Sequence, residues 1–142
     1  MSAPPPGLLV AAQIFGTFAM VGLIWFVQIV HYPMMRRFPE NGFAAIAREH
    51  CERTGSLVLP LMTLELASGF MLWIAGLRDP LFLLSLGLLA LIWLSTATLQ
   101  APLHRRLIQG KDPLVLDRLI ATNWIRTIAW TLRAVCLILV FS

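Results

Sequence analysis

Long apolar stretches alternate with shorter polar ones along the chain, and this alternation predicts the architecture. Four apolar runs cover residues 8–30, 57–77, 80–103 and 121–141. A helix needs roughly 20 residues to cross the hydrocarbon core of a bilayer, which is about 30 Å thick. We therefore predict an all-α membrane protein, a single domain over residues 1–142, built as a bundle of four transmembrane helices.

The polar segments between these runs carry helix signals of their own. In residues 41–56 apolar and charged side chains alternate at helical spacing, which predicts an interfacial helix that leads into the second run. Asp112 followed by Pro113 has the residue types of an N-cap and a first helical position. Proline interrupts helices, so we expect Pro60 to kink the second helix and Pro33 to end the first.

The two halves of the chain repeat a short pattern. Residues 33–38 (PMMRRF) align with residues 102–107 (PLHRRL), and residues 50–54 (HCERT) align with residues 123–127 (NWIRT). Two helical hairpins of the same orientation would be related by an axis along the membrane normal. The pattern favours a duplicated two-helix hairpin.

Composition and charge place the protein in a membrane and orient it there. With 58% hydrophobic and 13% charged residues and a mean hydropathy of +0.80, the chain is too apolar for a water-soluble domain of its size. Arginine and lysine concentrate in the loops between helices 1 and 2 and between helices 3 and 4. The positive-inside rule therefore puts these two long basic loops in the cytoplasm and both termini outside. We attribute the basic charge to anionic lipid headgroups at the cytoplasmic face and expect no nucleic acid partner.

Polar residues recur on one face of each predicted helix. Such residues are costly inside a membrane, so we expect them to face the interior of the bundle. The stripe in the fourth helix, at i, i+3, i+7 and i+10, consists of Asn123, Arg126, Trp130 and Arg133. The other stripes contain Gln28 and His31 in the first helix, His50, Arg53 and Glu65 in the second, and Thr96, Gln100 and His104 in the third.

Two of these charges are predicted to meet deep in the bundle. Glu65 lies twelve residues after Arg53, and Arg133 lies seven after Arg126. If the two reference arginines are level, the axial offset is about 7.5 Å at 1.5 Å per residue, which an arginine side chain covers. Either charge alone would be costly in hydrocarbon, so we predict that Glu65 and Arg133 form a buried pair.

The three histidines form a candidate metal site. His31, His50 and His104 all lie near the predicted cytoplasmic ends of their helices and can converge there. Three imidazoles are a ligand set for an iron, copper or zinc ion. None of the helical metal spacings H-x-x-H, E-x-x-H and H-E-x-x-H is present. The alternative is that each histidine is an interfacial side chain paired with its neighbours.

These stripes together predict a polar pocket that faces the cytoplasm and binds a metal or a small ligand. The candidate ligand-binding residues are Gln28, Arg53, Gln100, Asn123 and Arg126, in which the arginines would hold an anionic group. The candidate metal ligands are His31, His50 and His104, and the candidate catalytic residues are His50, Glu65 and Arg133. Alternatively, the amides serve as hydrogen bonds between helices. The protein would then be a non-catalytic accessory subunit of a larger membrane complex, or a small transporter, although its polar groups crowd the inner half of the membrane.

Several motifs resemble those of known membrane proteins. The stretches HYPMMRRF, HCERTGSLVLPLMTLELASG, TLQAPLHRRL and TNWIRTIAWTLR are similar to a family of small four-helix bacterial membrane proteins. More distantly, Asn123, Trp124 and Arg126 resemble the N-x-x-R or W-x-x-R pattern that begins the last helix in the anthrone-oxygenase-like family. The resemblance implies a multi-pass protein of the bacterial cytoplasmic (inner) membrane, as a homo-oligomer or in a larger complex. It also implies oxidative chemistry on an apolar aromatic substrate, which together with the candidate metal ligands would make the protein a metal-dependent oxidoreductase.

Overall fold

A computed structural model describes residues 6–142 and folds them into four long helical spans. The first five residues, with the end that we predict to lie outside, are not among the described residues. The first span consists of α1 (Gly7–Phe26), η1 (Val27–His31) and α2 (Tyr32–Met35), and the second is α3 (Phe43–Ile74). The third consists of α4 (Pro80–Ser95), η2 (Thr96–Gln100) and α5 (Ala101–Leu107), and the fourth is α6 (Pro113–Phe141). No strand occurs in the described part, and all four spans are long and apolar enough to cross a membrane, which confirms the predicted all-α bundle.

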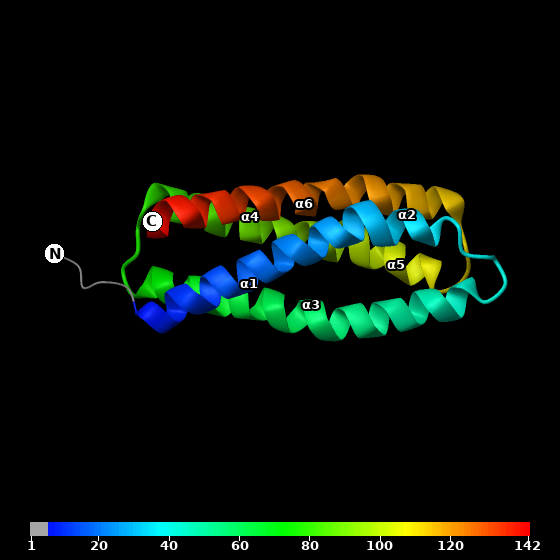
Figure 1. The fold of residues 1–142 in the computed structure, drawn as a ribbon, viewed down its shortest axis with the longest axis horizontal. Helices are drawn as coiled ribbons and strands as arrows, with labels where there is room; N and C mark the ends of the chain where they lie inside the picture. The colour runs from blue at the N-terminus through cyan, green and yellow to red at the C-terminus, as the bar shows by residue number, and fades with distance from the viewer. Residues whose placement is uncertain (1–5) are drawn as a thin grey trace.

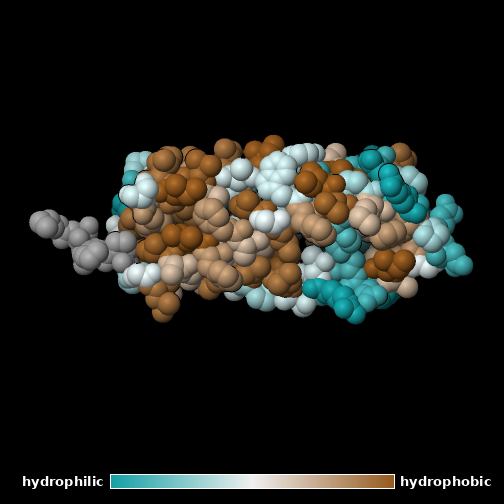
Figure 2. Space-filling view, in the orientation of Figure 1, coloured by the Kyte–Doolittle hydropathy of each residue, from teal (hydrophilic) through white to brown (hydrophobic). Residues whose placement is uncertain are grey.

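The four spans run side by side along the long axis of the molecule (Figure 1). Helix α6 packs against α1 and α4, α1 packs against α3, and α3 contacts α5. The start of α1 and the end of α6 lie at one end of the bundle, and the loops 36–42 and 108–112 lie at the other, which we call the basic end (Figure 1). Hydrophobic side chains cover most of the surface seen in Figure 2, whereas hydrophilic ones gather towards the basic end. This distribution suits a bundle that spans a bilayer.

The prediction that Pro33 ends the first helix is wrong, because the span continues to Met35. Immediately before Tyr32 the chain forms a π-helical segment, η1, and a second π-helical segment, η2, precedes Pro102 at the same distance. A proline ring clashes with the carbonyl one turn back in a regular α-helix, and a wider turn is one way of accommodating it. The two halves therefore share this irregularity as well as their sequence pattern.

The structure also shows how the second and fourth spans begin. Helix α3 starts after Gly42, whose φ of 82° lies in the left-handed region that favours glycine. From there it is one uninterrupted helix through Pro60, so the segment predicted to lie at the interface is its first half. The predicted N-cap at Asp112 is confirmed, because its carboxylate accepts hydrogen bonds from the backbone N–H groups of Leu114 and Val115.

Candidate functional site

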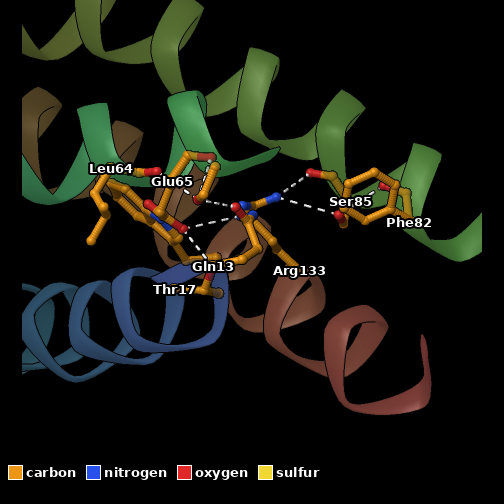
Figure 3. A network of polar contacts seen from close by, with 9 residues as sticks. Gln13, Thr17, Leu64, Glu65, Phe82, Ser85 and Arg133 are labelled. Carbon is orange, nitrogen blue, oxygen red and sulfur yellow. Dashed lines mark hydrogen bonds and ion pairs between the residues drawn. The ribbon is translucent and has the colours of Figure 1, made fainter. Parts of the chain in front are cut away.

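A buried ion pair lies between the helices of the bundle and contacts side chains from three of the four spans (Figure 3). Glu65 on α3 and Arg133 on α6 are both completely buried, and Arg133 Nε lies 3.1 Å from Glu65 Oε1. The same oxygen accepts a 2.7 Å hydrogen bond from Thr17 Oγ1 on α1, and Oε2 accepts one of 3.1 Å from Trp130 Nε1. The predicted pairing of Glu65 with Arg133 is confirmed.

The other end of the Arg133 guanidinium connects this network to the fourth span. Its Nη1 donates to the backbone oxygen of Ser85 at 2.8 Å and to the Ser85 hydroxyl at 3.3 Å (Figure 3). Gln13 on α1 and Ser68 on α3 extend the network, with the serine hydroxyl 2.6 Å from the amide oxygen. Because one carboxylate and one guanidinium bind all four spans together, the pair acts as an internal clamp of the fold.

A cavity of about 330 Å³ lies between the spans, nearer the basic end than this clamp. Its inner wall is apolar and includes Met20, Ile24 and Met62, with the ring of Trp130. Its wall towards the basic end is polar and includes Tyr32, His50, His104 and Arg126. Glu65 and Arg133 do not line it, so the geometry gives no support to the predicted catalytic role of that pair.

The edge of the cavity lies on the seam between the second and third spans. Leu59 of α3 lines the cavity and is 55% exposed, and Arg105 of α5 lines it and is also exposed. Leu59 lies on the apolar part of α3 that we predict to be inside the bilayer. The exposed side chains of Leu59 and Arg105 therefore place the edge of the cavity on the lateral surface of the bundle, between α3 and α5.

Arg126 dominates the polar wall and is held from behind by two amides. Its guanidinium donates through Nε, at 2.9 Å, and through Nη2 to Asn123 Oδ1. Asn123 in turn donates from Nδ2 to Gln28 Oε1 at 2.6 Å, and Gln28 donates to the backbone oxygen of Ile120 at 3.1 Å. Gln28 and Asn123 therefore fix the position of Arg126 without lining the cavity. The remaining contacts of the guanidinium, to Thr96 Oγ1 and Tyr32 Oη, are both long at 3.5 Å.

Beside Arg126, a row of side chains leads along the polar wall. The Tyr32 hydroxyl lies 2.9 Å from His104 Nε2, and His104 Nδ1 lies 3.6 Å from Cys51 Sγ. Gln100, also in the wall, donates from Nε2 to the backbone oxygen of Thr122 at 3.1 Å. Helix α5 thus places His104 between a phenol and a thiol, with both ring nitrogens engaged.

The three histidines do converge, as predicted, but the ring of His31 stacks on that of His50, and His104 lies tilted beside His50. The ring centroids of His31 and His50 are 4.2 Å apart with an interplanar angle of 19°, and those of His50 and His104 are 5.6 Å apart. His50 Nδ1 lies 3.1 Å from the hydroxyl of Thr54. Among residues 6–142, no group of three or more His, Cys, Asp or Glu side chains is arranged to hold a metal ion. The geometry therefore does not support the predicted metal site at His31, His50 and His104.

The predicted ligand-binding residues divide into three groups in the structure. Gln100 and Arg126 line the cavity, as do His50 and His104. Gln28 and Asn123 support Arg126 from behind. Arg53, by contrast, was expected to face the pocket but has a side chain 81% exposed, which pairs with Glu49 at 2.8 Å.

Sequence reasoning missed several residues that line the cavity. Tyr32 is the only tyrosine of the chain and lies next to His31, but we assigned it no role. Cys51, to which we also assigned no role, lies in the wall against His104. Trp130, by contrast, was placed on the interior stripe of the fourth helix; it lines the cavity and also donates to Glu65, so it connects the cavity with the clamp. A signal was available for Tyr32 alone, as an aromatic hydroxyl at the polar end of an apolar helix.

The chemistry of the cavity follows from its two unlike walls. One presents a guanidinium, a phenol and imidazoles, and the other presents aliphatic and aromatic carbon. Such a site suits a ligand with one polar and one apolar part. Comparisons of the chain with protein-family models, with curated proteins and with solved structures found no match.

Proposed function

We propose that this protein binds a lipophilic small molecule inside the membrane, with the apolar part of the ligand in the inner cavity and its polar end at Arg126, Tyr32 and His104. The observation that carries the proposal is the cavity itself. At about 330 Å³ it falls at the lower end of the size range of small-molecule pockets, roughly 300–1,000 Å³. Its walls segregate polar from apolar groups along the bundle axis.

The orientation of this segregation matches that of a lipid in one leaflet. The polar wall faces the basic end, where the headgroups of that leaflet would lie, and Met20 and Met62 lie towards the middle of the spans. A molecule already dissolved in that leaflet would also have its polar end towards the headgroups and its apolar part towards the middle of the bilayer. It could enter between α3 and α5 without turning over, which supports entry from the bilayer.

A cavity-filling variant tests the proposal. Gly55 lines the cavity, and a Cβ added to it would meet no heavy atom within 4 Å, so the side chain of Gly55→Leu has room to occupy the site. Gly87→Leu is the matched control, because Gly87 is also helical, also has open space around it, and does not line the cavity. Leucine favours helix over glycine by up to about 1 kcal/mol, so neither change should weaken its helix.

The experiment is photolabelling in proteoliposomes with two probes that share one chain, a diazirine-bearing hexadecanoic acid and the corresponding alcohol. We expect labelled peptides from α3 and α6 to contain cavity residues, and we expect this labelling to fall severalfold in Gly55→Leu but not in Gly87→Leu. Labelling spread over the lipid-facing surface, and equal in all three proteins, would refute the pocket and favour the accessory-subunit alternative.

Oxidation of the bound molecule stays a prediction from the resemblance to the anthrone-oxygenase-like family. The feature of this chain that bears on it is the row Tyr32, His104 and Cys51, which offers ionisable hydrogens beside the polar end of a ligand. Proton transfer is one half of such chemistry. A labelled ligand recovered unchanged after incubation with the protein in air would count against the enzymatic reading and leave binding intact.

A further inference from the structure

Arg126 is a buried cation that no described carboxylate balances. The residue is only 7% exposed. The salt bridges of the described residues occupy the carboxylates of Glu49, Glu65, Asp112 and Asp117, and none of them involves Arg126. Removing a guanidinium from water without a counter-charge costs several kcal/mol. The other fully buried arginine, Arg133, does have such a partner in Glu65. Position 126 is therefore exceptional within its own protein.

The edge of the Arg126 guanidinium that faces the cavity makes only weak hydrogen bonds. Nε and one hydrogen of Nη2 are used on Asn123 Oδ1, on the side away from the cavity. The other contacts, from Nη1 to Thr96 and from Nη2 to Tyr32, are at 3.5 Å, the outer limit of a hydrogen bond. A guanidinium has five N–H donors in a fixed fork, so Nη1 and Nη2 together have hydrogens available for a stronger acceptor.

The rest of the cavity is equally suited to negative charge. None of the residues that line it is an aspartate or a glutamate, whereas Arg105 and Arg126 both line it. The hydroxyl groups of Tyr32 and Thr54 also line the cavity and are hydrogen-bonded to the rings of His104 and His50. A ligand with an ammonium group would meet only like charge here, and an uncharged ligand would leave Arg126 unbalanced.

We infer that the ligand is a lipophilic carboxylic acid, bound as its carboxylate to the Nη1 and Nη2 edge of Arg126, with its hydrocarbon part against Met20, Met62 and Trp130. This inference rests on the function proposed above and names its ligand class. A monoanion balances the single buried guanidinium one for one, and its two oxygens match the two nitrogens of the fork. A phosphate monoester carries up to two charges and would need a second buried cation, while Arg105 at the edge is exposed.

The test compares competitors that share one hydrocarbon chain and differ in their head group. Proteoliposomes at alkaline pH, where the acid is ionised, are photolabelled with the diazirine probes, and unlabelled palmitate, hexadecanol and hexadecyl phosphate compete for the site. We expect palmitate to halve the labelling at a membrane mole fraction at least tenfold below that of hexadecanol. Equal potency of the acid and the alcohol would overturn the inference and leave the pocket standing. Stronger competition by hexadecyl phosphate would overturn the choice of carboxylate. No labelling of the cavity by either probe would instead overturn the proposed function.

Three variants assign the preference to one residue. In Arg126→Gln the ratio of acid to alcohol potency should fall close to one while the alcohol still labels the cavity. In Arg126→Lys, which keeps the charge but not the fork, the ratio should be intermediate, and this variant serves if the glutamine variant does not fold. Arg53→Gln is the control, because Arg53 aligns with Arg126 in the repeat but is exposed, and its ratio should equal that of the unaltered protein. An unchanged ratio in both Arg126 variants would refute the assignment.

Discussion

The pairing of Glu65 with Arg133 predicts that removing both charges harms the fold less than removing one. In Arg133→Leu the carboxylate of Glu65 stays completely buried and keeps only the donors Thr17 and Trp130. Breaking a buried ion pair in this way costs about 3–5 kcal/mol. The carbonyl of Ser85 also loses its donor, so we place the expected loss of unfolding free energy in the upper part of that range.

In the double variant Glu65→Leu/Arg133→Leu no unpaired charge remains. The Thr17 hydroxyl can turn to a backbone carbonyl one turn back in α1. The indole N–H of Trp130 is then the principal unsatisfied donor, at about 1–3 kcal/mol for a buried group. We therefore expect the double variant to be more stable than Arg133→Leu by about 2 kcal/mol, the difference between these two ranges.

The assay is unfolding in mixed micelles with a rising fraction of sodium dodecyl sulfate, followed by far-ultraviolet circular dichroism. The exposed pair Glu49 and Arg53, 2.8 Å apart, is the matched control, and its double-variant cycle should give a coupling of about 0.5 kcal/mol or less. A double variant at Glu65 and Arg133 that is no more stable than Arg133→Leu would show that the two charges do not stabilise each other.

Two further predictions concern packing and orientation. A Cβ on Gly16 would lie 2.9 Å from Cγ of Glu65, so Gly16→Ala should force α1 from α3 and cost about 1–3 kcal/mol of unfolding free energy; Gly22→Ala, with open space around it, should not destabilise. In a variant without native cysteines, Ser142→Cys should react with a membrane-impermeant maleimide added outside intact cells. Reaction only after permeabilisation would invert the predicted topology.

The fold and the ion pair were predictable from the sequence because both depend on regular helical spacing. Arg133 shares a helical face with Asn123 and Arg126, and Glu65 lies at nearly the same depth, so a period of 3.6 residues and a rise of 1.5 Å were enough to pair the two charges. The pairing was also expected on energetic grounds, because an unpaired charge in hydrocarbon has a high free-energy cost at any depth.

The wall of the cavity was less predictable because its details depend on local departures from that spacing. Arg53 lies three residues after His50, about 60° away around the helix, and close enough to the predicted headgroup region to turn outwards to Glu49. The π-helical segment η1 changes the phase of the first span just before Tyr32, so no regular helical wheel puts that hydroxyl beside Arg126. The stacking of His31 on His50 likewise depends on rotamers, which sequence spacing does not fix.

Entry of the ligand from the bilayer, as proposed above, determines which part of the ligand supplies the free energy of binding. A ligand that arrives from water gains by hiding its hydrocarbon, but one that arrives from the bilayer leaves a solvent as apolar as the leucine and methionine side chains that receive it. Its tail therefore contributes little beyond good packing, and the free energy of binding comes mainly from the few atoms of its head. Among the lipids of the leaflet, the protein would therefore select by head group, through the interaction of that group with Arg126.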